Sequence, residues 1–392
     1  MMKEFEFLKA ELDKMKENKT WQQMKQIETK QGPSVEVKGQ NVIQLSSNNY
    51  LGLTSHPRLV EAAKRAAEEF GAGTGSVRTI AGTFTMHNEL EKKLANFKKT
   101  EAALVFQSGF TTNQGVLSSI LTKEDIVISD ELNHASIIDG IRLTKADKKV
   151  YRHVDMDDLE RVLKKSMNYR MRLIVTDGVF SMDGNIAPLP DIVKLAEAYD
   201  AFVMVDDAHA SGVLGKNGRG TVNHFGLDGR VHIQVGTLSK AIGVLGGYAA
   251  GSQVLIDYLR HKGRPFLFST SHPPAVTAAC IEAIDVLLEE PEHMEKLWEN
   301  TAYFKDKLVQ MGLTLTKSET PIVPILIGEE EKAQALSDLL LTRGVFAQSI
   351  VYPTVAQGKA RIRTIITAEH TKEELDRALE VIHSAAKELQ LV

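Results

Sequence analysis

Short apolar runs alternate with helix-periodic segments through the middle of the chain. The runs are about four or five residues long and rich in Val and Ile, as expected for parallel strands buried on both faces. The predicted strands are Ala102–Phe106, Asp125–Ser129, Val150–His153, Leu173–Thr176 and Phe202–Val205. The predicted helices between them are Thr112–Leu121, Ser136–Thr144, Met156–Met167 and Leu189–Tyr199. This alternation predicts βαβ units, and therefore an α/β fold with a large, mostly parallel sheet.

The pattern changes after about Ala275, where longer helices predict a smaller α+β domain. Its expected helices are Pro274–Leu288, His293–Met311, Lys332–Arg343 and Thr371–Leu389, and its expected strands are Ile322–Ile327, Phe346–Ile350 and Arg361–Ile366. At the other end, a charged amphipathic helix is expected up to about Lys30, with an extended segment after Pro33. A chain of 392 residues is longer than one hydrophobic core usually organises. We therefore expect an N-terminal helix and arm at 1–45, a large domain at 46–275 and a small domain at 276–392.

Composition narrows the class of protein. Hydrophobic residues make up 43% and charged residues 25%, which is ordinary for a globular protein. A net charge of −4, with the basic residues dispersed, gives no reason to expect a nucleic acid or membrane partner. Cys280 is the one cysteine, so neither an internal disulfide nor a multi-thiolate metal site is expected. With no signal-peptide pattern or long apolar run, the expected location is the cytoplasm.

Polar residues that could bind a ligand or take part in catalysis follow two of the apolar runs. Asp206 and His209 come at the end of one run, and Lys240 follows the run that begins at His232. The carboxyl ends of strands in an open α/β sheet are where ligands bind. Taken alone, Asp206 or Asp207 could equally bind a metal or cap a helix. A lysine at such a site, however, becomes a covalent catalyst when it forms an imine with an aldehyde cofactor.

Five motifs along the chain resemble those of the α-oxoamine synthase family, within the fold-type I pyridoxal phosphate (PLP) enzymes. The resemblance extends from about Leu45 to the last predicted helix. The motifs are 47–53 (SNNYLGL), 129–136 (SDELNHAS), 178–184 (GVFSMDG), 205–209 (VDDAH) and 236–240 (GTLSK). The resemblance implies a transferase with the aspartate aminotransferase-like fold.

The resemblance implies roles for residues around the cofactor ring. Lys240 would carry PLP as a covalent aldimine and later act as the general base. Asp206 would pair with the protonated pyridine nitrogen, which keeps the ring an electron sink. His209 would donate to the phenolic oxygen, with Ser181 near the same edge. His134 would stack on the ring beside the substrate.

Further residues match positions that hold the cofactor phosphate. Gly109 and Phe110 lie in a turn before a predicted helix, whose free N–H groups would suit an anion. The hydroxyl of Thr237 could add a contact. Thr270 and Ser271 match a segment that reaches the phosphate from the other subunit in this family. The resemblance therefore implies a homodimer with shared active sites.

Other residues match positions that bind the substrates in this family. Arg363 matches the arginine that binds the substrate carboxylate, and a guanidinium suits a carboxylate bidentately. Asn48 would assist it. Arg361, two positions away on the same face of a strand, is the second candidate. Thr354 matches a position near the acyl-CoA. No metal site is assigned.

The implied reaction is the condensation of a small amino acid with an acyl-CoA. Local runs at 76–83 (SVRTIAGT), 264–269 (RPFLFS) and 360–364 (ARIRT) favour the glycine C-acetyltransferases, which make 2-amino-3-oxobutyrate from glycine and acetyl-CoA in threonine degradation. The alternative is 8-amino-7-oxononanoate synthesis from alanine and a pimeloyl thioester, with loss of carbon dioxide, in biotin biosynthesis. Transamination on the same fold also stays open, and a PLP-binding regulatory module lacks the DNA-binding domain it would need.

Overall fold

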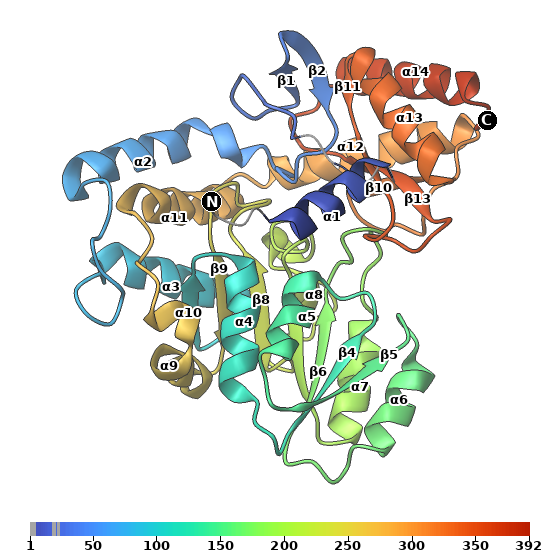
Figure 1. The fold of residues 1–392 in the computed structure, drawn as a ribbon. Helices are drawn as coiled ribbons and strands as arrows, with labels where there is room; N and C mark the ends of the chain where they lie inside the picture. The colour runs from blue at the N-terminus through green and yellow to red at the C-terminus, as the bar shows by residue number, and fades with distance from the viewer. Residues whose placement is uncertain (1–4, 18–20, 22–23) are drawn as a thin grey trace.

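The computed structural model describes residues 5–17, 21 and 24–392, and its centre is a seven-stranded sheet. The strand order is β3-β9-β8-β7-β6-β4-β5 (Figure 1). The strands are β3 (Ala102–Phe106), β4 (Ile126–Asp130), β5 (Asp147–Tyr151), β6 (Arg172–Asp177), β7 (Phe202–Asp206), β8 (Ile233–Thr237) and β9 (Gly247–Gly251). Strands β8, β7, β6, β4 and β5 pair in parallel, and β9 runs antiparallel to both β3 and β8. The predicted mostly parallel sheet is confirmed, with β9 as an unpredicted strand.

Helices cover both faces of this sheet, which explains its continuous apolar strands. Leu173 and Val175 of β6 pack in one core cluster with α4 (Gly109–Ile120) and α5 (Ala135–Arg142). Ile174, which points to the opposite face, packs with α6 (Met156–Lys164) and α7 (Leu189–Ala198). Helix α9 (Gln253–Lys262) and the short helix α10 (Arg264–Leu267) pack against β3 at the other end of the sheet, whereas Val222 of the short helix α8 (Thr221–His224) packs in the same cluster as α6 and α7. Residues at the strand ends are therefore held by packing on two sides.

A group of three helices lies beside the β3 end of the sheet. Helix α11 (Pro274–Glu289) packs against α2 (Pro57–Phe70) and α3 (Thr85–Lys98), and the group shares one apolar cluster with β3 and β9. The boundary predicted between 275 and 276 falls at the start of α11. Most of this helix therefore lies after the boundary, although it packs against α2 and α3, which lie before it.

The C-terminal region contains two small sheets and three long helices. One sheet is antiparallel, in the order β10 (Ile322–Gly328), β13 (Ala360–Ile365) and β12 (Gln348–Ile350). The expected strand at 346–350 is divided, because Val345–Phe346 forms β11 in the other sheet. Helices α12 (Glu292–Gln310), α13 (Glu330–Thr342) and α14 (Lys372–Glu388) pack around the antiparallel sheet and bury an apolar core of their own.

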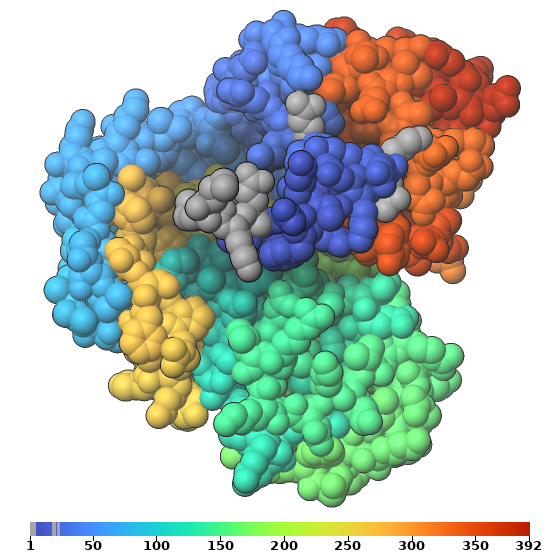
Figure 2. All heavy atoms as spheres, viewed as in Figure 1, coloured from blue at the N-terminus to red at the C-terminus, as the bar shows by residue number. Residues whose placement is uncertain are grey.

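The N-terminal segment contributes to the second small sheet. Strands β1 (Ser34–Val37) and β2 (Gln40–Gln44) form an antiparallel hairpin, and β2 pairs in parallel with β11. Helix α1 (Glu6–Glu17) has no buried residue and lies across the front of the molecule in Figure 2. The helix predicted up to Lys30 is wrong for residues 24–30, which have no helical structure; Ile27 instead forms a β-bridge with Val37. Residues 1–4, 18–20 and 22–23 of that prediction lie outside the described residues.

Across the described part of the chain, every helix is too short or too polar to cross a bilayer.

Candidate active site

A cavity of about 230 Å³ lies at the carboxyl ends of the central strands. Asp206 is the last residue of β7, and Lys240 lies in the turn after β8. Loops after β4 and β6 and the start of α4 complete the wall. The cavity is lined by Ser108, Gly109, Phe110, His134, Ser136, Asp177, Val179, Ser181, Asp206, Ala208, His209, Thr237, Ser239 and Lys240. Eight residues predicted from the sequence are thus gathered in one chamber.

Asp206 is buried and its carboxylate is fixed by two donors. The side-chain amide of Asn113, in α4, donates to Oδ2 at 2.7 Å, and the backbone N–H of Ala208 donates to Oδ1 at 2.9 Å. Asn113 also donates to Ser136 Oγ at 2.8 Å. Both donors hold the carboxylate of Asp206 in one orientation. Sequence reasoning did not single out Asn113. The feature that could have identified it is a polar amide in the second turn of a predicted helix, on the same buried side as Val116 and Leu117.

Lys240 is buried beside acids that oppose the effect of its burial. Desolvation lowers the pKa of the ammonium to about 8, although Asp206 and Asp177 favour the charged form. Arg363 adds to the lowering. A lysine with this pKa has a substantial neutral fraction near neutral pH. It is therefore suited both to nucleophilic attack on a carbonyl and to accepting a proton.

His209 is a buried imidazole held by a tyrosine. Burial, with the positive charges of Lys240 and Arg363, holds its pKa well below the usual value, so the ring is neutral. The hydroxyl of Tyr50 lies 2.8 Å from Nδ1. Burial also raises the pKa of Tyr50, so the phenol keeps its proton. With Tyr50 donating to Nδ1, the imidazole proton is on Nε2, where His209 can donate to a ligand.

His134 begins α5 and is oriented through its backbone and its ring. Its N–H donates to Asp177 Oδ2 at 2.8 Å, and its Nδ1 lies 2.8 Å from Ser136 Oγ. Burial lowers the pKa of the imidazole. Asp177 is also buried, and burial together with the charge of Asp206 raises its pKa well above the usual value. Sequence reasoning missed Asp177, although it ends β6 as Asp206 ends β7.

The start of α4 provides an anion site next to β8. Ser108 caps the helix by accepting from Thr111 N at 3.1 Å. The N–H groups of Gly109 and Phe110 have no partner among the described residues and belong to the cavity wall. A Cβ on Gly109 would lie 3.3 Å from the Cβ of Thr237, so glycine keeps this corner open. Free N–H groups at a helix N-terminus favour a phosphate or carboxylate.

Two arginines of β13 have different surroundings. Arg363 is largely buried; its Nε donates to Ser181 O at 2.7 Å and its Nη2 to Asn48 Oδ1 at 3.2 Å. Among the described residues, Arg363 has no carboxylate partner. Arg361 is already paired with Asp183, at 2.6 Å, and donates to Met182 O. The geometry therefore favours Arg363 over Arg361 as the residue available to a substrate carboxylate.

Five predicted residues do not line the chamber of their own chain: Asn48 and Arg363, described above, and Thr270, Ser271 and Thr354. Thr270 forms a β-bridge with Val77, and Ser271 Oγ donates to Gly82 O at 2.6 Å. Thr354 is exposed and lines an adjoining cavity of about 640 Å³, which shares Ser181 with the first.

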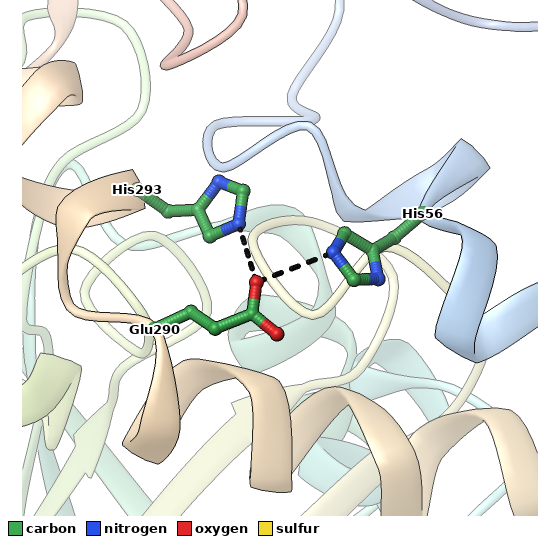
Figure 3. A group of neighbouring side chains, drawn as sticks. All are labelled: His56, Glu290 and His293. Carbon is green, nitrogen blue, oxygen red and sulfur yellow. Dashed lines mark hydrogen bonds and ion pairs between the residues drawn. The ribbon is translucent and has the colours of Figure 1, made fainter.

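A separate cluster, His56, Glu290 and His293, has the composition of a metal site (Figure 3). The Nε2 atoms of the two histidines lie 3.4 and 3.3 Å from Glu290 Oε2. Nδ1 of His56, however, accepts from the N–H of Arg58 and caps α2. The proton of neutral His56 is therefore on Nε2, directed at Glu290, whose other oxygen accepts from Arg58 at 2.8 Å. We interpret the cluster as a hydrogen-bonded ion-pair network.

Comparison with known proteins agrees with this geometry. Residues 40–382 match the family described as aminotransferase class I and II, a class of PLP enzymes. The chain is 99% identical over 391 residues to 8-amino-7-oxononanoate synthase 1 of Bacillus velezensis, and 86% identical over 392 residues to the Bacillus subtilis protein of that name, covering 100% of each chain. A serine palmitoyltransferase from S. paucimobilis, solved with a PLP–myriocin aldimine, superposes with a TM-score of 0.94 at 33% identity, covering 99% of this chain and 98% of that one. The chain belongs to the α-oxoamine synthase family of PLP-dependent enzymes.

The residues of the cavity fit PLP in charge and hydrogen bonding. Asp206 would provide the anion for a protonated pyridine nitrogen, and His209 would provide a donor for an oxygen of the cofactor. The unpartnered N–H groups at the start of α4 suit a phosphate. Lys240 provides an amine that burial makes available at moderate pH.

Proposed function

We propose that this protein condenses alanine with a pimeloyl thioester, such as pimeloyl-CoA, to form 8-amino-7-oxononanoate, CoA and carbon dioxide. The choice of substrates rests on the 99% identity to a relative that bears this enzyme's name. It favours the alternative of the sequence analysis over glycine and acetyl-CoA, because the two Bacillus relatives named above are both 8-amino-7-oxononanoate synthases. The observation that carries the chemistry is the shared chamber of Lys240, Asp206 and His134, with Arg363 uncompensated nearby.

We assign the roles as follows. Bound PLP supplies an electron sink for negative charge at the amino acid α-carbon. Lys240 holds the cofactor and moves the proton at that carbon. Asp206 holds the proton on the pyridine nitrogen. His134 orients the ring from one face, with its backbone N–H fixed on Asp177.

Other residues bind the substrates and the phosphate of the cofactor. Arg363, assisted by Asn48, binds the alanine carboxylate, because its half-buried guanidinium has no acidic partner among the described residues. Gly109, Phe110 and Thr237 hold the phosphate of the cofactor. Ser181 lies between this chamber and the adjoining cavity, where Thr354 is placed to meet the acyl-CoA.

A homodimer would complete the site. Thr270 is exposed and lies outside the chamber of its own chain, which agrees with a role across a subunit interface, whereas Ser271 is buried and its hydroxyl donates to Gly82 O in its own chain. Mixing inactive Lys240→Ala chains with Thr270→Val/Ser271→Ala chains tests this arrangement. Shared sites predict that mixed dimers recover activity, since one of their two sites contains neither substitution. If mixing restores no activity while mixed dimers form, the shared site is wrong. We expect the dimer in the cytoplasm, a reducing compartment that suits the single buried thiol of Cys280.

Free thiol release by the cofactor-loaded protein tests the reaction. The matched substrate pairs are alanine with pimeloyl-CoA and glycine with acetyl-CoA, and Lys240→Ala is the control. We expect release with the first pair, and carbon dioxide in equal amount. Preference for the second pair would return the protein to the glycine reaction. Amino-group transfer to a 2-oxo acid without thiol release would instead make it an aminotransferase.

A further inference from the structure

Two adjacent carboxylates at the end of β7 have different surroundings. Asp206 lines the active-site chamber, whereas Asp207 does not. The side chain of Asp207 is fully buried, and its Oδ2 lies 2.7 Å from Nζ of Lys98, the last residue of α3, which is also fully buried. The chemistry assigned above uses the first carboxylate and gives this ion pair no role.

The ion pair joins the turn after β7 to three other elements. Lys98 also donates to Arg219 O at 2.5 Å, just before α8. Asp207 Oδ1 accepts from the hydroxyl of Thr221, the first residue of α8, at 2.6 Å. The backbone N–H of Asp207 donates to Val235 O of β8 at 2.7 Å. A shift of Asp207 would therefore disturb its contacts with α3, α8 and β8 at once.

Two glycines let the backbone approach the ion pair closely. A Cβ on Gly220, whose φ is 97°, would lie 2.1 Å from Asp207 Oδ2 and 2.6 Å from Lys98 Nζ. A Cβ on Gly178 would lie 2.4 Å from Asp207 Oδ1. Gly178 lies in the loop after β6, between two residues that line the chamber, and its N–H donates to Asp206 O at 2.8 Å. This part of the chamber wall thus packs directly on the carboxylate of Asp207.

Stability alone does not account for a buried pair of this kind. Taking two charges out of water is costly, and apolar residues of similar volume often replace such a pair without loss of stability. Its place in the chain is more informative: of residues 206–209, three line the chamber and the fourth is Asp207. The contacts of Asp207 therefore help to decide where the carboxylate of Asp206 and the imidazole of His209 lie.

We propose that the Lys98–Asp207 ion pair is a positioning device, which holds residues 206–209 so that Asp206 and His209 reach the pyridine nitrogen and the phenolic oxygen of the cofactor together. This inference rests on the proposed function in assigning those two contacts. Functional side chains must be held within about 0.5 Å of their productive positions, and charge-assisted hydrogen bonds are about twice as strong as neutral ones. A neutral pair of similar shape should therefore fill the space but position the turn less well.

The absorption of the bound cofactor tests this role without substrate. In the PLP-loaded protein, the visible band titrates with the proton on the imine that Lys240 forms. A pyridinium held by Asp206 and a hydrogen bond from His209 both disfavour that proton, so a loosened turn should raise the midpoint. We expect the neutral pair Lys98→Met/Asp207→Asn to raise it by about one pH unit, and to weaken the visible circular dichroism of the bound cofactor. Neither readout uses alanine or a thioester, so the result does not depend on which reaction the loaded protein catalyses.

Two further variants separate positioning from general stability. Leu163→Ala removes a fully buried side chain of α6 that does not line the chamber, so it should lower stability in urea and keep the wild-type midpoint. Thr221→Val removes the hydroxyl donor of Asp207 and keeps the ion pair, so it should raise the midpoint by a smaller amount.

A wild-type midpoint and circular dichroism in the folded double variant would overturn the proposal. If the double variant does not fold, the same result for Thr221→Val refutes it. An equal rise of the midpoint in Leu163→Ala would also refute it, because general destabilisation would then account for the effect.

Discussion

The side-chain amide of Asn113 lies 2.7 Å from Asp206 Oδ2, which joins the second turn of α4 to the end of β7. The same helix provides the unpartnered N–H groups of Gly109 and Phe110 one turn earlier. One helix therefore contributes to two ends of the proposed cofactor site: it orients the acid that would pair with the pyridine nitrogen, and it supplies the N–H groups that would bind the phosphate.

Asn113→Ala should reduce turnover while leaving the protein folded. The substitution removes a charge-assisted hydrogen bond worth about 1.5–3 kcal/mol from a buried carboxylate, so kcat should fall about 10- to 100-fold. Ser118→Ala is the matched control, because it removes a side-chain hydrogen bond of the same helix, to Gln114 O, that does not involve Asp206. Steady-state kinetics at saturating PLP measure both variants. Equal effects of the two substitutions would contradict a specific role for the Asn113–Asp206 contact.

Covalent loading of PLP should depend on pH through Lys240. Burial lowers the pKa of this amine to about 8, and only the neutral amine attacks an aldehyde. The loading rate of cofactor-free protein should therefore rise with pH and level off above about pH 9. At pH 6 it should be about 100-fold below the plateau, because the neutral fraction falls tenfold for each pH unit below the pKa. Borohydride reduction at timed intervals, followed by mass spectrometry of the chain, gives the rate. A midpoint near the ordinary lysine pKa would refute the effect of burial.

Arg363→Lys should affect the amino acid more than the acyl-CoA. The substitution keeps the charge but removes the bidentate geometry, so KM for alanine should rise at least about tenfold. KM for pimeloyl-CoA should change less than threefold. Arg361→Lys is the matched comparison on the same strand, and its guanidinium is already engaged with Asp183. A larger rise in the alanine KM for Arg361→Lys would exchange the two assignments.

The ion pair of Lys98 and Asp207 should matter for stability. Both side chains are fully buried, and their charged atoms lie 2.7 Å apart. Burial opposes the ammonium of Lys98, but the carboxylate of Asp207 more than offsets it and raises the pKa. Lys98→Met leaves the carboxylate buried, with Thr221 as its one remaining partner among the described residues, which should cost about 3–5 kcal/mol in unfolding free energy. Adding Asp207→Asn should recover part of the loss, as measured by urea denaturation. Additive losses would argue against a coupled pair.

The sequence predicts best those strands that are buried on both faces. The runs at β3, β4, β6 and β7 are continuously apolar, which is why their positions agree within one or two residues. Strand β5 lies at the sheet edge, and its exposed Asp-Lys-Lys start hides it from a pattern of apolar residues. Strand β9 consists of Gly, Ala and one Tyr, and its glycines resemble a loop. Its antiparallel direction is set by pairing with β3 and β8, and this pairing cannot be predicted from the residues of β9 alone.

In the candidate site too, residues marked by a local sequence pattern are predictable, and contacts between residues far apart in the chain are not. Asp206 and Lys240 are predictable because strand ends meet at one edge of the sheet. Tyr50 lies within a motif singled out from the sequence, but its contact with His209 joins residues far apart in the chain. Asn113 and Asp177 act only through the packing of α4 and β6 on their neighbours.

The pairing of β2 with β11 has a consequence for biosynthesis. Ile43 and Gln44 are translated about 300 residues before the strand that covers their edge. At about 5–20 residues per second, the ribosome leaves this edge open for about 15–60 seconds. Throughout that interval the hairpin of β1 and β2 is an uncapped template for other nascent chains. Release of the finished C-terminus, rather than completion of the catalytic sheet, is thus the event that protects the beginning of the chain from aggregation.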